Sequence, residues 1–235
     1  MNVDNKTVAI IVCAGSGNRM NSNISKQFME ICGLPVIIRT LITFDNSELI
    51  DSIILVIGKN DSTWYDTNLA KYNLKKDIKI IVGGETRFDS VKNGLNALSS
   101  DTKYICIHDG VRCLITENDI NDICKIAYEN DSCIAVQKST DTLKLVSGDN
   151  IVKTLKREEI FRAQTPQVFR KDLFLEAVQN NNLSESEITD DSILMESYGK
   201  CVKYYICGPE NIKITTQNDL FSAEKIIIER NKNSK

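Results

Sequence analysis

Short apolar runs alternate with stretches of helical periodicity along most of the chain. The runs are continuous, as expected for strands that are buried on both faces of a parallel sheet. The clearest of them are Val8–Cys13, Ile53–Ile57, Ile78–Val82, Tyr104–Ile107 and Cys133–Val136. Between the last three runs, apolar residues recur at helical spacing, and each such stripe is expected to pack on the sheet. We therefore predict a β-α-β-α chain that forms an α/β fold.

The pattern changes between residues 138 and 156. Partly alternating apolar and polar residues, Thr142–Val146 and Ile151–Leu155, flank the turn-forming cluster Ser147–Asn150. This arrangement predicts a β-hairpin that projects as a two-stranded arm. An isolated hairpin is only marginally stable in water, so the arm is expected to pack on a second subunit. The sequence therefore favours a homodimer formed through this arm.

The segment that follows the arm is predicted to complete the same domain. Thr165–Phe169 returns to the body, a helix follows from Asp172, and a late strand at Val202–Ile206 precedes a terminal helix through Ile228. No internal repeat or low-complexity segment interrupts the chain. We predict one Rossmann-like domain over residues 1–235, with a mostly parallel sheet, helices on both faces and the projecting arm.

Charge and hydropathy narrow the class of protein. The 235 residues include 29 Lys and Arg against 32 Asp and Glu, a net charge of −3, with no cluster of basic residues. Binding to a nucleic-acid backbone depends on such a cluster, so we expect no nucleic-acid partner. No apolar run approaches the ~18–20 residues that span a bilayer. The polar N-terminus lacks the pattern of a signal peptide, and a cytoplasmic protein is expected.

The eight cysteines do not form a recognisable metal or disulfide pattern. No C-x-x-C pair is present, and the chain contains one histidine, His108. Most of the cysteines lie in apolar runs, where a free thiol behaves as a small hydrophobic side chain. We expect a buried thiol at each position. Cys13 adjoins the glycine-rich loop described next, and that position raises the hypothesis of sensitivity to thiol reagents.

A glycine-rich segment follows the first predicted strand. Gly15 and Gly17 lie at the carboxyl edge of the sheet, where bare backbone N–H groups commonly bind phosphate. Met20 stands where a dinucleotide-binding loop needs its third glycine, and the Gly-Lys-Ser/Thr of a Walker loop is absent. Two cations, Arg19 and Lys26, follow the glycines and could neutralise a triphosphate.

With these features the chain resembles the 2-C-methyl-D-erythritol 4-phosphate cytidylyltransferase family, within the nucleotidyltransferases that make sugar or polyol nucleotides. The resemblance covers nearly the whole chain and rests on several short motifs in the same order. Besides the glycine-rich loop they are Gly83–Arg87 with Asp89–Val91, His108–Arg112, Asp141-Thr142, Arg157 with Ala163–Gln167, Thr189–Asp191 and Asn211–Thr215.

The resemblance implies transfer of CMP from CTP to the phosphate of methylerythritol phosphate, with release of pyrophosphate. Because this nucleophile is already anionic, the reaction needs alignment and charge neutralisation and no general base. Arg19 and Lys26 would be the catalytic residues that hold the triphosphate. Mg²⁺ would be the cofactor, held mainly by the phosphates of CTP.

The resemblance also implies two sets of binding residues. Those expected to contact CTP are Ala14, Gly15, Gly17, Gly84, Glu85, Ser90, Asp109 and Gly110. Those expected to gather the polyol phosphate are Arg112, Asp141, Thr142, Arg157, Thr165, Thr189 and Lys213. In the family, the region of Asp141, Thr142 and Arg157 crosses to the neighbouring subunit.

Other interpretations remain open at the level of the sequence. The nearest is a ribitol-5-phosphate cytidylyltransferase, and one of another class is a non-catalytic nucleotide-binding regulator. Arg87 and Arg112 could form ordinary ion pairs, and Asp190-Asp191 could cap a helix or belong to the site. For His108 we favour a buried structural role, because the expected chemistry needs no histidine.

Overall fold

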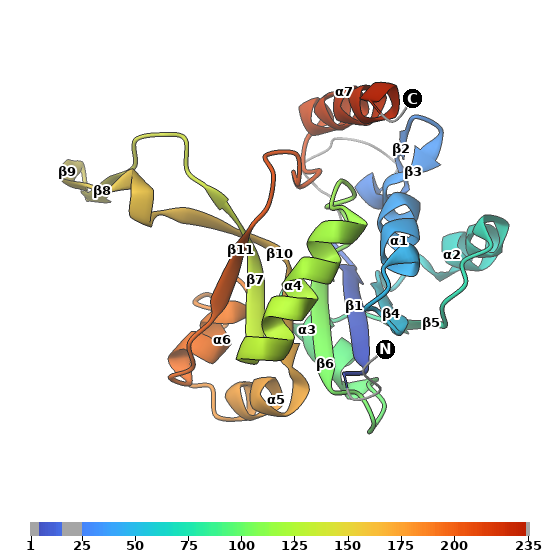
Figure 1. Cartoon of the computed structure of the whole chain (residues 1–235), viewed down its shortest axis with the longest axis horizontal. Helices are drawn as coiled ribbons and strands as arrows, with labels where there is room; N and C mark the ends of the chain where they lie inside the picture. Colours follow the sequence, from blue (N-terminus) through green and yellow to red (C-terminus); the bar gives the residue numbers. More distant parts are fainter. Residues whose placement is uncertain (1–4, 16–24, 234–235) are drawn as a thin grey trace.

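A seven-stranded sheet forms the centre of the computed structural model, which describes residues 5–15 and 25–233 (Figure 1). Its strands run in the order β11-β7-β10-β6-β1-β4-β5. Their bounds are β1 Thr7–Cys13, β4 Ser52–Ile57, β5 Ile78–Val82, β6 Tyr104–Asp109, β7 Ser132–Lys138, β10 Phe161–Arg170 and β11 Lys203–Ile206. All neighbouring pairs are parallel except those of β10, which is antiparallel to both β6 and β7. The predicted α/β fold with a mostly parallel sheet is confirmed.

Helices cover both faces of the sheet, and each face has its own apolar core. Ile11 of β1 packs with α1 (Val36–Asn46) and α4 (Glu117–Asn130). Ile10, which points to the opposite face, packs with α3 (Arg87–Asn96), α5 (Lys171–Gln179) and α6 (Ser192–Ser197). Both isoleucines are fully buried, as the continuous apolar runs predict. Burial of one such side chain contributes about 1.5–3 kcal/mol to the free energy of unfolding.

The remaining elements lie at the edges of this sandwich. They are η2 Lys26–Phe28, β2 Glu30–Ile31, β3 Leu34–Pro35, α2 Ser62–Asn68, η3 Leu69–Tyr72, η4 Arg157–Glu159 and α7 Gln217–Asn233. A third, smaller core joins α7 to Ile31 of β2 and to the segment after β6. Among the described residues, no helix has both the length and the apolar character that crossing a membrane requires.

The parallel strands bring three chain segments to one edge of the sheet. Val12 of β1 pairs with Asp109 at the end of β6, and Cys13 pairs with Ile57 of β4. Ile57 in turn pairs with Val82, the last residue of β5. The segments that follow β1, β5 and β6 therefore all begin at the same edge.

The predicted hairpin is present as a separate two-stranded sheet, which extends away from the body (Figure 1). Its strands are β8 Lys144–Ser147 and β9 Asn150–Thr154, joined by a turn in which Gly148 has a φ of +54°. Four large apolar side chains of this arm are 49–66% exposed: Leu145, Val146, Ile151 and Val152.

Two features differ from the prediction. Thr165–Phe169 is part of a ten-residue strand, β10, which lies between β6 and β7. Its polar residues Gln164 and Gln167 are buried and hydrogen-bonded, so the strand lacks a continuous apolar run.

All eight cysteines are free, as expected, but Cys32 and Cys201 are exposed, so the prediction of a buried thiol at each position is wrong for these two. Both lie outside strands, Cys32 in the β2–β3 turn and Cys201 before β11.

Helix α4 begins with a capping box that can be tested. Thr116 accepts a hydrogen bond from the backbone N–H of Asp119, and the Asp119 carboxylate accepts one from the N–H of Thr116. Thr116→Ala should lower the free energy of unfolding by about 1 kcal/mol, measured by urea denaturation. Thr116→Ser keeps the hydroxyl and should stay close to the wild type. Equal losses in the two variants would contradict the capping role.

Candidate active site

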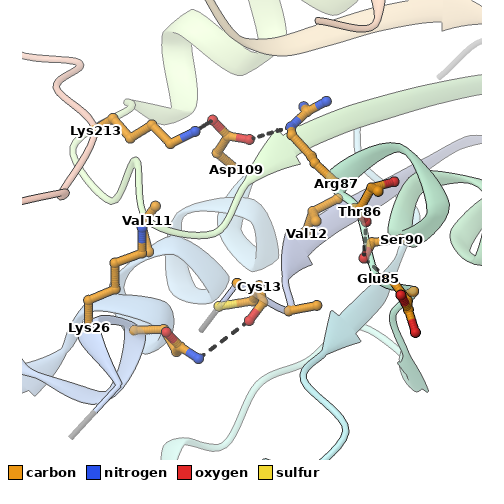
Figure 2. A pocket seen from close by; sticks show the side chains of 14 residues that line it. Val12, Cys13, Lys26, Glu85, Thr86, Arg87, Ser90, Asp109, Val111 and Lys213 are labelled. Atoms are coloured by element: carbon orange, nitrogen blue, oxygen red, sulfur yellow. Dashed lines mark hydrogen bonds and ion pairs between the residues drawn. The ribbon is translucent and has the colours of Figure 1, made fainter. Parts of the chain in front are cut away.

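A pocket of about 270 Å³ opens at the carboxyl edge of the sheet (Figure 2). It is bounded by the ends of β1 and β6, the turn between β5 and α3, the short helix η2 and the segment around Lys213. Eight residues of the predicted site line it: Ala14, Gly15, Lys26, Gly84, Glu85, Ser90, Asp109 and Lys213. The fold thus brings together residues that are up to 199 positions apart in the chain.

Asp109 is surrounded by three cationic side chains. Its carboxylate lies 3.1 Å from Nε of Arg87, 2.8 Å from Nζ of Lys213 and 3.6 Å from Nε of Arg112. Figure 2 shows Arg87 and Lys213 approaching this carboxylate from opposite sides. Burial alone would raise the pKa of Asp109, but the charges of Arg87 and Lys213 outweigh it and hold the pKa well below its usual range. Asp109 is therefore a carboxylate at neutral pH.

Arg87 connects this cluster to a second buried carboxylate. Its Nη1 and Nη2 donate to the two oxygens of Asp191 at 3.0 and 2.8 Å, in a bidentate pair. Burial lowers the pKa of Arg87, but the two carboxylates outweigh it and raise the pKa above its usual range. Three cations, Arg87, Arg112 and Lys213, therefore surround the carboxylates of Asp109 and Asp191.

The backbone of Asp109 is held by a chain of hydrogen bonds. Its N–H donates to Oγ1 of Thr165 at 3.0 Å, and this hydroxyl lies 3.1 Å from Nδ1 of His108. Nε2 of His108 lies 3.2 Å from the carbonyl of Arg112, which can only accept, so we assign the proton to Nε2 and the Thr165 hydroxyl as donor to Nδ1. Burial lowers the pKa of His108 to about 3, so the ring is neutral. This arrangement supports the structural role expected for His108.

The turn after β5 is shaped by two glycines. The N–H of Gly84 donates to Oγ of Ser90 at 3.1 Å, and this hydroxyl donates to the carbonyl of Thr86 at 3.0 Å. A Cβ at Gly84 would lie 2.2 Å from Cβ of Asp89, and one at Gly83 would lie 2.6 Å from Cβ of Ala14. No larger residue fits at either position without a shift of the chain.

Several predicted residues do not line the pocket. Arg112, Gly110 and Thr165 lie beside or behind Asp109. Thr189 lies in the loop that precedes α6. Asp141, Thr142 and Arg157 belong to the arm and its base, where they are exposed. Gly17 and Arg19 fall outside the residues that the structure describes.

Asp190 and Asp191, which precede α6, have different roles. The sequence left open whether this pair caps the helix or belongs to the site. Asp190 accepts a hydrogen bond from the N–H of Ile193 at the start of the helix, at 3.3 Å. Asp191 makes no side-chain cap and pairs with Arg87. Capping thus falls to Asp190, and Asp191 belongs to the network behind the pocket.

Sequence reasoning missed several side chains of the pocket: Val12, Gln27, Thr86, Arg87 and Val111. The sequence allows Arg87 an ordinary structural ion pair. Arg87 does form buried ion pairs, and one of its partners is Asp109 of the site. The Thr-x-x-Asp spacing of Thr86 and Asp89 signals the capping box that begins α3 at the pocket. That signal could have placed Thr86 and Arg87 at the site.

The described residues contain no group of three or more His, Cys, Asp or Glu side chains arranged to hold a metal ion. Cys13 lines the pocket, but its thiol is buried, and burial raises its pKa to about 12. Because the thiolate is the reactive form, this environment opposes the sensitivity to thiol reagents that the sequence suggested at Cys13.

Comparisons with known proteins give one consistent match. The sequence model of the family described as 2-C-methyl-D-erythritol 4-phosphate cytidylyltransferase matches residues 7–229. Proteins of that name from Alkaliphilus oremlandii and Clostridium novyi are 39% and 42% identical to this chain, over 94% of its length and 95% and 96% of theirs.

Solved structures agree with this match. The crystal structure of 4-diphosphocytidyl-2C-methyl-D-erythritol synthase from Anaerococcus prevotii superposes with a TM-score of 0.86 at 34% identity, covering 96% of this chain and 97% of that one. The 2-C-methyl-D-erythritol 4-phosphate cytidylyltransferase of Francisella tularensis gives a TM-score of 0.77 at 30% identity, covering 94% and 99%.

The environment of Cys13 predicts the order in which the cysteines react. In the native protein at neutral pH, iodoacetamide should modify the exposed Cys32 and Cys201 well before Cys13, with or without CTP. Peptide mass spectrometry over a time course measures the three rates in one sample. Modification of Cys13 as fast as Cys32 would show that its thiol is accessible and would contradict the structure.

Proposed function

The chain belongs to the 2-C-methyl-D-erythritol 4-phosphate cytidylyltransferase family, and we propose that the pocket around Lys26, Asp109 and Lys213 is its active site. The enzyme is a nucleotidyltransferase that transfers CMP from CTP to 2-C-methyl-D-erythritol 4-phosphate in the non-mevalonate isoprenoid pathway. The products are 4-diphosphocytidyl-2-C-methyl-D-erythritol and pyrophosphate. The family match favours methylerythritol phosphate over ribitol phosphate as the acceptor, and the retained cations argue against a non-catalytic regulator.

The observation that carries the assignment of the site is the cluster of cations at one edge of the sheet. The acceptor phosphate attacks the α-phosphorus of CTP and needs no general base. Accordingly, Asp109 and His108, which are buried at the pocket, are not suited to accept a proton at neutral pH, since Asp109 is held ionised by its cations and His108 has a pKa of about 3. Catalysis then depends on positioning and on charges that are already in place.

We place CTP with its phosphates toward Lys26 and Arg19. The base would lie at the turn after β5, where Gly84, Glu85 and Ser90 line the pocket with Ala14 and Gly15. The ribose would lie near Asp109 and Gly110. This orientation is supported by the positions of Lys26 and Glu85, which lie at different sides of the pocket in Figure 2.

Mg²⁺ would be held mainly by the phosphates of CTP. The described residues provide no cage of carboxylates, and the Asp109 carboxylate is occupied by cations. Mg²⁺ commonly binds through substrate phosphates with few protein ligands, so this donor set fits the ion. When bound, it would neutralise charge on the phosphate oxygens, while Lys26 would stabilise the triphosphate from the protein side.

The acceptor phosphate would bind beside CTP, where Lys213 and Arg112 lie near Asp109 and Thr165 holds the backbone N–H of Asp109. Thr189 is a further expected ligand of this phosphate. Asp141, Thr142 and Arg157 lie on the arm, apart from this chain's own pocket. We propose that in a homodimer they complete the pocket of the partner. The exposed apolar side chains of the arm support such an interface, because they would otherwise face water.

The reaction is tested by measuring pyrophosphate release with CTP, Mg²⁺ and a panel of acceptors. We expect release with 2-C-methyl-D-erythritol 4-phosphate and little with ribitol 5-phosphate or hexose 1-phosphates, and less when UTP replaces CTP. Faster turnover with ribitol 5-phosphate would keep the mechanism and change the substrate. CTP binding without release for any acceptor would indicate the non-catalytic regulator.

The crossing of the arm is tested by mixing two variants whose activity is expected to be strongly reduced. Lys26→Ala and Arg157→Ala chains are purified separately, unfolded together and refolded. If Arg157 serves the partner's pocket, half of the dimers contain one intact pocket, and the mixture should recover about a quarter of the wild-type activity. Each variant refolded alone is the control. A mixture no more active than its components would place Lys26 and Arg157 in the same chain's pocket.

A further inference from the structure

The helix η2 is a single 3₁₀ turn whose three side chains differ in their contacts, although Lys26 and Gln27 both border the pocket. Successive side chains of such a helix point about 120° apart, so three residues face three directions. Lys26 faces the pocket. Gln27 is 1% exposed, and Phe28 packs against an aromatic pair of α2. The contacts of Gln27 and Phe28 therefore contribute to the backbone position from which the Lys26 side chain extends.

The buried amide of Gln27 connects this turn to two separate elements. Its Nε2 donates to Oδ2 of Asp61, which precedes α2, at 3.1 Å. The same nitrogen lies 3.4 Å from the carbonyl oxygen of Cys13, the last residue of β1. The bond to Cys13 is buried and the bond to Asp61 is partly buried, and together they hold the turn between the end of the sheet and the start of α2.

Aromatic packing holds the turn from its other side. The ring of Phe28 stacks on Trp64 with centroids 4.2 Å apart and an interplanar angle of 21°. It also meets the edge of Tyr65, which is fully buried, at 5.5 Å. Packing of this kind resists sliding of η2 along α2 but leaves rotation of the turn less restricted, whereas a directional hydrogen bond restricts that rotation.

We propose that Gln27 is a positioning residue, which together with Asp61 sets the direction in which Lys26 enters the pocket. The proposal rests on the proposed role of Lys26 at the triphosphate. A lysine side chain has several rotatable bonds, and its reach is defined only when its backbone is fixed. A misplacement of about 1 Å at a catalytic group can reduce the rate about 100-fold. A small rotation of η2 would therefore lower kcat.

The first test replaces the amide without leaving a cavity. Gln27→Met keeps the length and approximate volume of the side chain and removes both hydrogen bonds. We expect kcat to fall by about 10-fold while the KM for CTP changes less than about threefold, because alignment in the transition state is lost and ground-state binding is largely kept. Pyrophosphate release measures both constants, and circular dichroism and thermal unfolding verify the fold.

Variants of Asp61 test the same hydrogen bond from its other partner. Asp61→Ala removes the acceptor and should lower kcat in the same direction, and Asp61→Asn keeps an acceptor oxygen and should restore most of it. Asp66→Ala is the matched control, since it removes the same charge from an exposed position of the same helix. Loss of kcat in Asp66→Ala equal to that in Asp61→Ala would attribute the effect to helix charge and overturn the proposal.

A double-mutant cycle decides whether Gln27 acts through Lys26. In the Lys26→Ala background, Gln27→Met should lower kcat by less than about twofold, because the group that it positions is gone. A full 10-fold loss in that background, or a kcat within twofold of wild type for Gln27→Met and Asp61→Ala alike, would overturn the proposal. A Lys26→Ala enzyme with wild-type kcat would instead show that the proposed role of Lys26 fails.

Discussion

The buried carboxylate of Asp109 connects parts of the chain that are otherwise independent. It ends β6, receives Arg87 from the start of α3, and meets Lys213 from the segment that precedes α7. A carboxylate taken out of water is costly unless opposite charges and hydrogen bonds replace its hydration. Two of the cations that meet this requirement, Arg87 and Lys213, also line the pocket. The side chains that stabilise this edge are thus also side chains of the proposed site.

This arrangement suits a reaction whose nucleophile is already charged. The Thr165 hydroxyl and the neutral ring of His108 hold the backbone of Asp109, so its carboxylate has little freedom to move. Fixed charges need no reorganisation while the phosphates change their charge distribution. Lys26 enters the same pocket from a separate element, η2.

The sequence predicted the parts of the molecule in which local pattern and environment agree. Strands β1, β4 and β6 are continuous apolar runs because both of their faces are covered, and the hairpin follows from its turn residues. Strand β10 was missed because Gln164 and Gln167 satisfy their polar groups through side-chain hydrogen bonds that no local pattern reveals. The same reason hid the separate roles of Asp190 and Asp191, since the partner of Asp191 lies 104 positions earlier in the chain. The pairing of Arg87 with the site likewise depends on tertiary structure.

The place of β10 in the sheet has a consequence for the order in which the protein can fold during synthesis. Strands β6, β1, β4 and β5 occupy consecutive places in the sheet, so this half of the sheet can assemble once residue 109 has left the ribosome. Strand β7 is next along the sequence, but its neighbours in the sheet are β10 and β11. It therefore waits for at least residues 161–170 before any of its backbone groups can pair. During that interval both edges of β7 and one edge of β6 are unpaired on the nascent chain, and unpaired edges of this kind favour association with other chains.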